Sequence, residues 1–110
     1  MSKNKRRKLT PKNEFRFNNK TQHKNYIFAE TDKKYRAVGL TTDSETFGKK
    51  NMPLSSNPQK GKTDKSYIRV GIINEYKNEF GRKLSNYAFS SADFKNVKAK
   101  IRNYKKKQKK

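Results

Sequence analysis

Apolar residues are sparse along this chain and gather in short runs that polar turn residues separate. The runs NYIFAE at 25–30 and KYRAVGL at 34–40 are rich in residues that favour strands. TDK at 31–33 lies between them and supplies turn chemistry. This pattern predicts a β-hairpin with its turn at residues 31–33.

Alternation along a strand also assigns each side chain to a face. In the first strand of this hairpin, Tyr26 and Phe28 are expected to share one face. Ile27 and Ala29 are expected to share the other. In the second strand, one face is expected to carry Tyr35 and Ala37, and the opposite face Arg36, Val38 and Leu40.

Turn residues dominate the stretch from 41 to 65. A short strand is predicted at 51–54, and Pro53 indicates that it lies at a sheet edge, because proline has no N–H for the ladder. The segment SSNPQKGKTDK at 55–65 is predicted to be a basic loop. Another short strand, with a buried phenylalanine, is expected within 75–84.

The segment SYIRVGIIN at 66–74 is predicted to be the longest strand, although an arginine lies within it. Alternation places the aliphatic side chains at 68, 70 and 72 on one face and Tyr67 with Arg69 on the other. The aliphatic face is expected to be the core face. Arg69 is then either a solvated side chain or one that points toward an anionic ligand.

The last element is predicted to be a helix over 91–104. Ser90 suits the N-cap, and Asp93 at the third helical position is expected to complete a capping box. One apolar stripe follows helical spacing and consists of Phe94, Val97, Ile101 and Tyr104.

Together these elements predict a mainly β fold with a C-terminal α-helix, arranged as a small, partly open barrel. Three segments are expected along the chain. Residues 1–22 form a flexible basic arm, residues 23–104 form the barrel and its helix, and residues 105–110 form a basic tail. Within the arm, the alternation of Phe15 and Phe17 with charged residues leaves a short strand or docking segment as an alternative.

Charge decides which partners are plausible. The chain has 110 residues, with 30 Lys and Arg against nine Asp and Glu, a net charge of +21 and a pI of about 10.3. Eight of the basic residues lie in 1–22 and nine in 95–110. Such an excess favours an anionic partner, with nucleic acid first. Two alternatives are tails that only solubilise the protein and, for KKKQKK at the C-terminus, an anionic membrane surface.

Several classes of protein are disfavoured by what the composition lacks. There is no cysteine, so disulfides, thiolate metal sites and cysteine nucleophiles are excluded. No apolar run is long enough for a transmembrane segment, and no signal-peptide pattern opens the chain. A single histidine with no carboxylate cluster beside it makes no metal site. We therefore expect a cytoplasmic protein with no cofactor and no metal.

Aromatic residues alternate with cations in NYIF, KYR and SYIR, and this combination is typical of proteins on which bases stack while cations hold phosphates. In a chain with few aliphatic residues, such aromatic residues more often belong to the core, so at most one or two of Tyr26, Phe28, Tyr35 and Tyr67 are expected to face a ligand. The residues predicted to contact nucleic acid are Lys24, Tyr35, Arg36, Lys49, Lys50, Lys60, Lys62, Tyr67, Arg69, Lys105, Lys106 and Lys107.

His23 is the only histidine, and it suits either a surface turn or general acid–base work near neutral pH. The run LTTDSET at 40–46 carries hydroxyls and acids but no known nucleophile motif, so an ordinary turn is the alternative there.

The order of several short motifs resembles the PemK/MazF toxin family over about residues 24–101. The motifs are GLTT at 39–42, SYIR at 66–69, KNEFGRKL at 77–84 and FSSADFKNV at 89–97. The resemblance implies a small Src-homology-3-like barrel, a homodimer in many members and an acidic antitoxin as partner. It also implies metal-independent cleavage of single-stranded RNA.

By this resemblance the family's catalytic Thr or Ser corresponds to Thr41 or Thr42, whereas the arginine of the family's first loop has no counterpart. His23 is then a candidate base for the ribose 2′-hydroxyl, and Arg69 or Arg36 a candidate cation for the charge that develops on phosphorus. Two further hypotheses remain: a non-catalytic nucleic-acid-binding accessory protein of a phage or mobile element, and a ribosome-associated protein.

Overall fold

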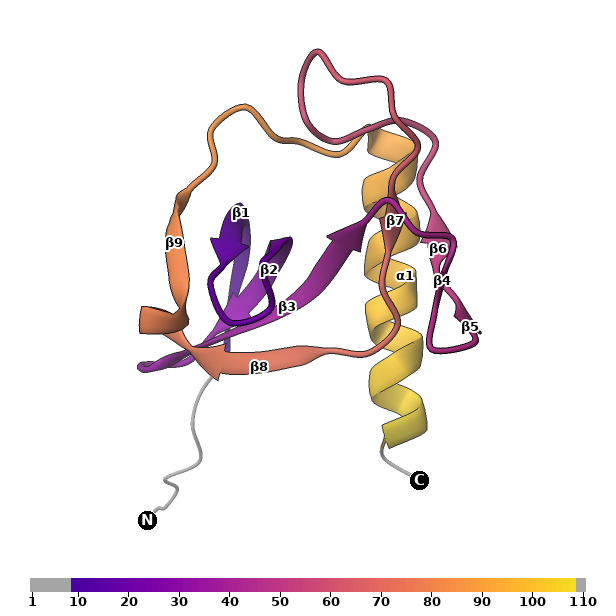
Figure 1. Ribbon diagram of the computed structural model, residues 1–110. Coiled ribbons are helices and arrows are strands. Elements are labelled where there is room, and N and C mark those ends of the chain that lie inside the picture. Colours follow the sequence, from indigo (N-terminus) through magenta and orange to yellow (C-terminus); the bar gives the residue numbers. More distant parts are fainter. Residues whose placement is uncertain (1–8, 109–110) are drawn as a thin grey trace.

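The computed structural model describes the backbone of residues 9–108 and the side chains of residues 9–104. Over these residues the chain is mainly β with one C-terminal helix (Figure 1). In order, the elements are β1 (Thr10–Asn18), β2 (His23–Glu30), β3 (Lys34–Thr41), β4 (Glu45–Thr46), β5 (Lys49–Lys50), β6 (Met52–Pro53), β7 (Tyr67–Ile68), β8 (Ile73–Tyr76), the 3-10 helix η1 (Lys77–Glu79), β9 (Phe80–Lys83) and α1 (Ser91–Gln108).

The main sheet is antiparallel and has the strand order β6-β7-β3-β2-β1-β9, with β8 also paired to β3. The short helix η1 joins β8 directly to β9. β8 pairs with β3, and β9 pairs with β1, which lies on the other side of β2. The consecutive segments β8, η1 and β9 therefore connect the two outer strands of the β1–β2–β3 group. The sheet therefore curls into a barrel-like shape (Figure 1), which confirms the predicted fold class.

The larger core lies between one face of this sheet and α1. The N-cap prediction is confirmed, because the Ser90 hydroxyl accepts the N–H of Asp93 at 3.2 Å. The predicted helical stripe is also confirmed, with Val97 and Ile101 buried against the sheet. The buried residues of this core are Phe15, Tyr26, Phe28, Ala29, Val38, Leu40, Leu54, Ile68, Val97 and Ile101.

A second, smaller core lies on the opposite face and consists of Ile27, Tyr35, Ala37 and Phe80, with Ile73 packed against it. The predicted hairpin of β2 and β3 is confirmed. However, the β2–β3 register shifts between Ile27 and Ala29, and this bulge turns Ala29 into the larger core. The expectation that Ile27 and Ala29 share a face is therefore wrong.

The two ends differ from the expected flexible segments. The prediction of an arm over 1–22 is wrong for Thr10–Asn18, which form β1, the longest strand, with Phe15 buried in the larger core. At the other end α1 continues to Gln108, so the first part of the expected tail at 105–110 is helical. Residues 1–8 and 109–110, and the side chains from residue 105 onward, lie outside the described part of the chain.

The expected long strand at 66–74 is also wrong. Its two ends, β7 and β8, pair with different parts of the same edge of β3, and residues 69–72 form a bulge between them. Gly71, with a φ of 91°, supplies the left-handed conformation at this break. As a result Val70 is exposed rather than part of the core face.

Candidate functional site

A groove with a volume of about 320 Å³ lies where β2 begins and β3 ends. In the β2–β3 pair Asn25 lies opposite Gly39, so the first residues of β2 run beside the last residues of β3. The loop between β6 and β7 and the segment before α1 form the opposite wall. The lining residues are Gln22, His23, Lys24, Leu40, Thr41, Thr42, Asp43, Asn57, Pro58, Gln59, Lys62, Asp64, Ser66 and Tyr87.

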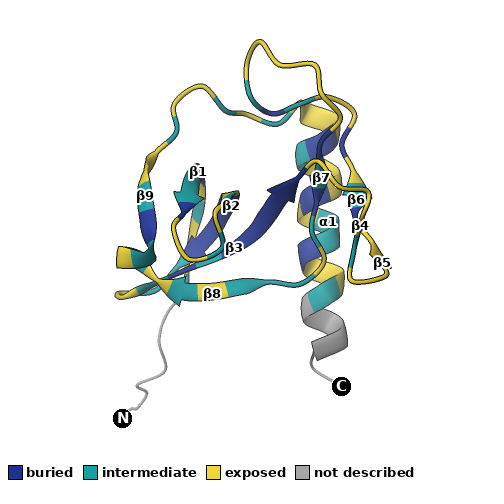
Figure 2. Ribbon diagram, in the orientation of Figure 1, coloured by how far each residue is buried: buried dark blue, intermediate teal, exposed yellow. Residues whose placement is uncertain are grey.

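Hydrogen bonds connect the two parts of this opposite wall, which are the β6–β7 loop and the segment before α1. The N–H of Ala88 donates to the carbonyl of Pro58 at 2.9 Å, and the hydroxyl of Tyr87 donates to Oε1 of Gln59 at 3.0 Å. Burial raises the pKa of Tyr87 above its ordinary value, which further favours the protonated hydroxyl that donates this bond. The wall is thus a fixed structure even though much of the loop surface is exposed (Figure 2).

Asp93 fastens the start of this loop to the helix. The predicted capping box is only half formed: Asp93 does not bond back to Ser90 among the hydrogen bonds of the described residues. Instead, its buried carboxylate accepts the N–H of Ser55 at 2.9 and 3.0 Å and that of Ser56 at 3.2 Å. The first turn of α1 therefore positions the loop that forms the groove.

Three of the four predicted catalytic residues line the groove: His23, Thr41 and Thr42. Thr41 is buried, and its Oγ1 already accepts the N–H of Asp43 at 3.1 Å. Thr42 is exposed, so its hydroxyl is the more accessible of the two. His23 is half-buried at the first position of β2.

Arg69, the fourth predicted residue, lies outside the groove lining. Its N–H donates to the carbonyl of Gly39 at 2.9 Å, and its side chain packs over that glycine. A Cβ at Gly39 would lie 3.2 Å from Cδ of Arg69, so an alanine there would require this side chain to shift by a few tenths of an ångström. The prediction that Arg69 points outward beside Tyr67 on a continuous strand is wrong. The strand is interrupted after Ile68, and the Arg69 side chain packs along β3.

The groove itself has almost balanced charge. Lys24 and Lys62 contribute the cations, and Asp43 and Asp64 contribute two carboxylates. All four side chains belong to exposed residues, and none forms an ion pair among those described for residues 9–104. The groove therefore combines one imidazole, two accessible ammonium groups, two accessible carboxylates and an accessible hydroxyl.

One of the predicted nucleic-acid contacts is buried in the fold, and another is half-buried. Tyr35 is only 8% exposed and packs edge-on against Phe80, with Arg16 and Lys77 over its ring. The prediction that it stacks on a base is wrong, because the ring is buried in the smaller core. Arg36 is half-buried, and its Nε is buried without a hydrogen-bond partner.

The remaining predicted contacts lie on several elements. Lys49 and Lys50 are exposed on β5, and Lys60 is exposed in the loop that forms the groove wall. Tyr67 is half-buried on β7, opposite Thr41. The backbone of Lys105, Lys106 and Lys107 is helical, and their side chains lie outside the described part.

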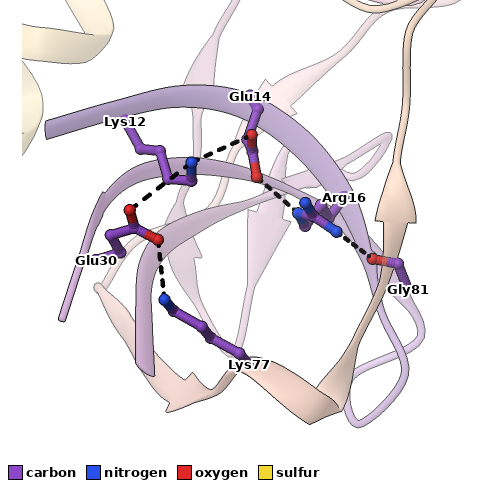
Figure 3. A network of polar contacts seen from close by, with 6 residues as sticks. All are labelled: Lys12, Glu14, Arg16, Glu30, Lys77 and Gly81. Carbon is purple, nitrogen blue, oxygen red and sulfur yellow. Dashed lines mark hydrogen bonds and ion pairs between the residues drawn. The ribbon is translucent and has the colours of Figure 1, made fainter. Parts of the chain in front are cut away.

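The carboxylates that do form ion pairs lie on other parts of the sheet. Arg16 bonds Glu14 at 2.6 Å and the carbonyl of Gly81 at 2.9 Å, while Glu30 joins Lys12 to Lys77 (Figure 3). Burial by itself raises the pKa of Glu14, but the hydrogen bond and charge of Arg16, with nearby lysines, lower it below its ordinary value. This network stabilises β1 in the sheet.

One exposed residue was missed by the sequence analysis. Phe47 is 95% exposed at the turn between β4 and β5, directly before Gly48 and the two lysines of β5. The signal was present, since a phenylalanine followed by glycine and two lysines interrupts a polar loop.

No protein-family model, curated protein or solved structure significantly matches this chain. The resemblance to the PemK/MazF family thus stays a prediction. Within residues 9–108, no group of three His, Cys, Asp or Glu side chains gathers closely enough to hold a metal ion. In the same region no helix has the length and apolar character needed to cross a membrane.

Proposed function

We propose that this protein binds nucleic acid, with RNA favoured over DNA. The observation that carries the proposal is the net charge of +21 together with the distribution of ion pairs. The described ion pairs use Glu14, Glu30 and Glu75, and none involves the lysines of the groove or of β5. These exposed ammonium groups remain available to phosphates.

Binding of this kind has a measurable signature. Each phosphate contact releases a condensed counterion, so the logarithm of the affinity falls linearly with the logarithm of the salt concentration, with a slope of about −0.7 per contact for single strands. A fluorescein-labelled single-stranded RNA of about twelve nucleotides, titrated at several KCl concentrations and followed by anisotropy, measures this slope.

The Lys60→Gln/Lys62→Gln double variant should flatten the slope by about 1.4, because two contacts are lost. Lys33→Gln is the matched control: Lys33 is equally exposed but lies in the β2–β3 turn, at the far end of β2 from His23. Affinity that does not depend on salt, or no binding at low salt, would contradict the proposal. Competition with DNA of the same sequence tests the preference for RNA.

A second candidate function is metal-independent cleavage of single-stranded RNA, which the clustering of His23, Thr41 and Thr42 in one groove favours. In this reaction a base removes the proton of a 2′-hydroxyl, and the resulting oxygen attacks the adjacent phosphorus. The bond to the 5′-oxygen breaks, and that oxygen takes up a proton. His23 would exchange these protons, and Lys24 or Lys62, rather than Arg69, would stabilise the phosphorane charge. The resemblance to PemK/MazF toxins supports the same chemistry.

Incubation of the RNA with EDTA tests this candidate. Cleavage should give 2′,3′-cyclic phosphate and 5′-hydroxyl ends, and both His23→Ala and Thr42→Ala should abolish it. Ser44→Ala, which removes an exposed hydroxyl close to the groove, is the control. RNA that is bound but stays intact would exclude cleavage and leave the accessory-protein and ribosome-associated hypotheses, which co-sedimentation with ribosomes separates. An acidic antitoxin and a homodimer remain predictions for pull-down and size-exclusion measurements.

A further inference from the structure

The hairpin of β4 and β5 forms a separate two-stranded sheet with a single exposed aromatic ring at its tip. Thr46 pairs with Lys49, so Phe47 and Gly48 form a two-residue turn. Both have positive φ, 50° and 77°, as in the type I′ turns that suit the twist of such hairpins. Phe47 is 95% exposed.

Phenylalanine is an unusual residue for this position. The left-handed conformation favours Asn, Asp or Gly at the first place of the turn, and a bulky side chain there is strained. The ring offsets none of this strain by packing, because it is almost fully exposed. A residue that neither suits its backbone nor contributes to the core points to a role in contacts with another molecule.

The base of the hairpin is held in place by Asn51, which is buried. Its N–H donates to the carbonyl of Ser44 at 2.9 Å, and its Nδ2 donates to the carbonyl of Asp43 at 3.0 Å and to Oγ1 of Thr46 at 2.9 Å. Its Oδ1 accepts the N–H of Val70 at 3.3 Å. The hairpin is therefore anchored before any ligand arrives, which lowers the entropy lost on binding.

We propose that Phe47 stacks on an unpaired base while Lys49 and Lys50 bind the flanking phosphates. This inference rests on the proposed nucleic-acid binding and assigns a contact within it to the β4–β5 hairpin. An aromatic ring beside lysines is the combination that binds single strands without sequence preference. Among the described residues, the other large exposed apolar side chains are Val70, whose N–H bonds Asn51 at the base of the hairpin, and Tyr76 on β8. Phe47 is therefore the one exposed aromatic ring of the hairpin. One ring matches one base, whereas a protein partner or a bilayer requires a larger apolar area.

The test uses the full chain and a single-stranded RNA of about twelve nucleotides that carries 2-aminopurine, whose fluorescence is quenched by stacking. Phe47→Asn is the main variant, because asparagine suits the positive φ and the hairpin should keep or gain thermal stability. We expect its Kd to rise by at least about fivefold, with loss of quenching and an unchanged salt slope. Lys49→Gln/Lys50→Gln should instead flatten the slope by about 1.4 and keep the quenching of the bound complex.

Tyr76→Asn is the matched control, since Tyr76 is an exposed aromatic residue on β8. It should bind as the wild type does. If wild-type protein binds and quenches the RNA and Phe47→Asn does so equally, the stacking inference is overturned while nucleic-acid binding stands. If wild-type protein fails to bind RNA or DNA at low salt, both are overturned. Binding to phosphatidylglycerol vesicles that Phe47→Asn abolishes, with RNA affinity unchanged, would assign the ring to a membrane surface and also overturn the inference.

Discussion

Replacing Asp93 by alanine tests whether the groove depends on the helix. Asp93 is 2% exposed, and its carboxylate accepts the backbone N–H groups of both Ser55 and Ser56. Because it lies in the first turn of α1, it also interacts favourably with the helix dipole. Alanine removes the charge and the protein acceptor of both amides.

The expected loss follows from these contacts. A hydrogen bond to a charged group contributes about 1.5–3 kcal/mol, and the lower value applies here because the two serines are exposed and water replaces part of each bond. Two such amides give a loss of about 3 kcal/mol, which lowers Tm by about 12 °C or more in a domain of this size. Asp93→Asn keeps one acceptor oxygen and should lose about half as much.

Urea unfolding followed by circular dichroism measures this loss, and brief trypsin treatment of the native protein reports on the loop through cleavage at Lys60, Lys62 and Lys65. Asp93→Ala should speed that cleavage. Asp64→Ala is the matched control, because it removes the same charge from an exposed position of the same loop and should cost less than about 0.5 kcal/mol. Equal stability and equal cleavage rates for the two variants would refute the role of Asp93.

Two other substitutions concern buried polar groups. The Tyr26 hydroxyl is buried without a partner, so Tyr26→Phe should be at least as stable as wild type at pH 7; a loss above about 1 kcal/mol would contradict this. Burial raises the pKa of Tyr26 from 10.0 to about 12, so wild-type stability should fall with pH across that interval, and less steeply in the phenylalanine variant. Glu14→Gln should cost about 1–3 kcal/mol at pH 7. Since the pKa of Glu14 is lowered, this contribution is lost as pH falls below 4.5, and denaturation curves of both proteins should converge there.

The sequence predicts best the elements that local pattern alone determines. The β2–β3 hairpin and the helix were predicted because strand formers surround a short turn in one, and a capping serine precedes an apolar stripe in the other. Alternation in β3 was also correct, with Val38 and Leu40 in one core and Tyr35 in the other.

The errors came from contacts between distant parts of the chain. β1 looked like a basic arm because its charges were counted as solvated, whereas Glu14 and Arg16 neutralise each other within the sheet. The bulge at 69–72 arises because β7 and β8 pair with one edge of β3 in different registers, which no local pattern reveals.

The candidate site was predicted in part. His23, Thr41 and Thr42 lie in the same groove because β2 and β3 are adjacent and antiparallel. Tyr35 was misassigned because alternation along a strand cannot show that the opposite face is also covered. The Asp93 carboxylate bonds the loop rather than the N–H of Ser90, and only the folded chain shows that contact.

The position of β2 determines which amide protons exchange with solvent most slowly. This strand has β1 and β3 on its two edges, and five consecutive residues from Asn25 to Ala29 are buried. Its amides should exchange with deuterium only through global unfolding, while those of the separate β4–β5 hairpin should exchange through local opening. A ligand held at Phe47 would therefore protect the hairpin amides directly, and the β2 amides would slow only as far as the whole fold is stabilised.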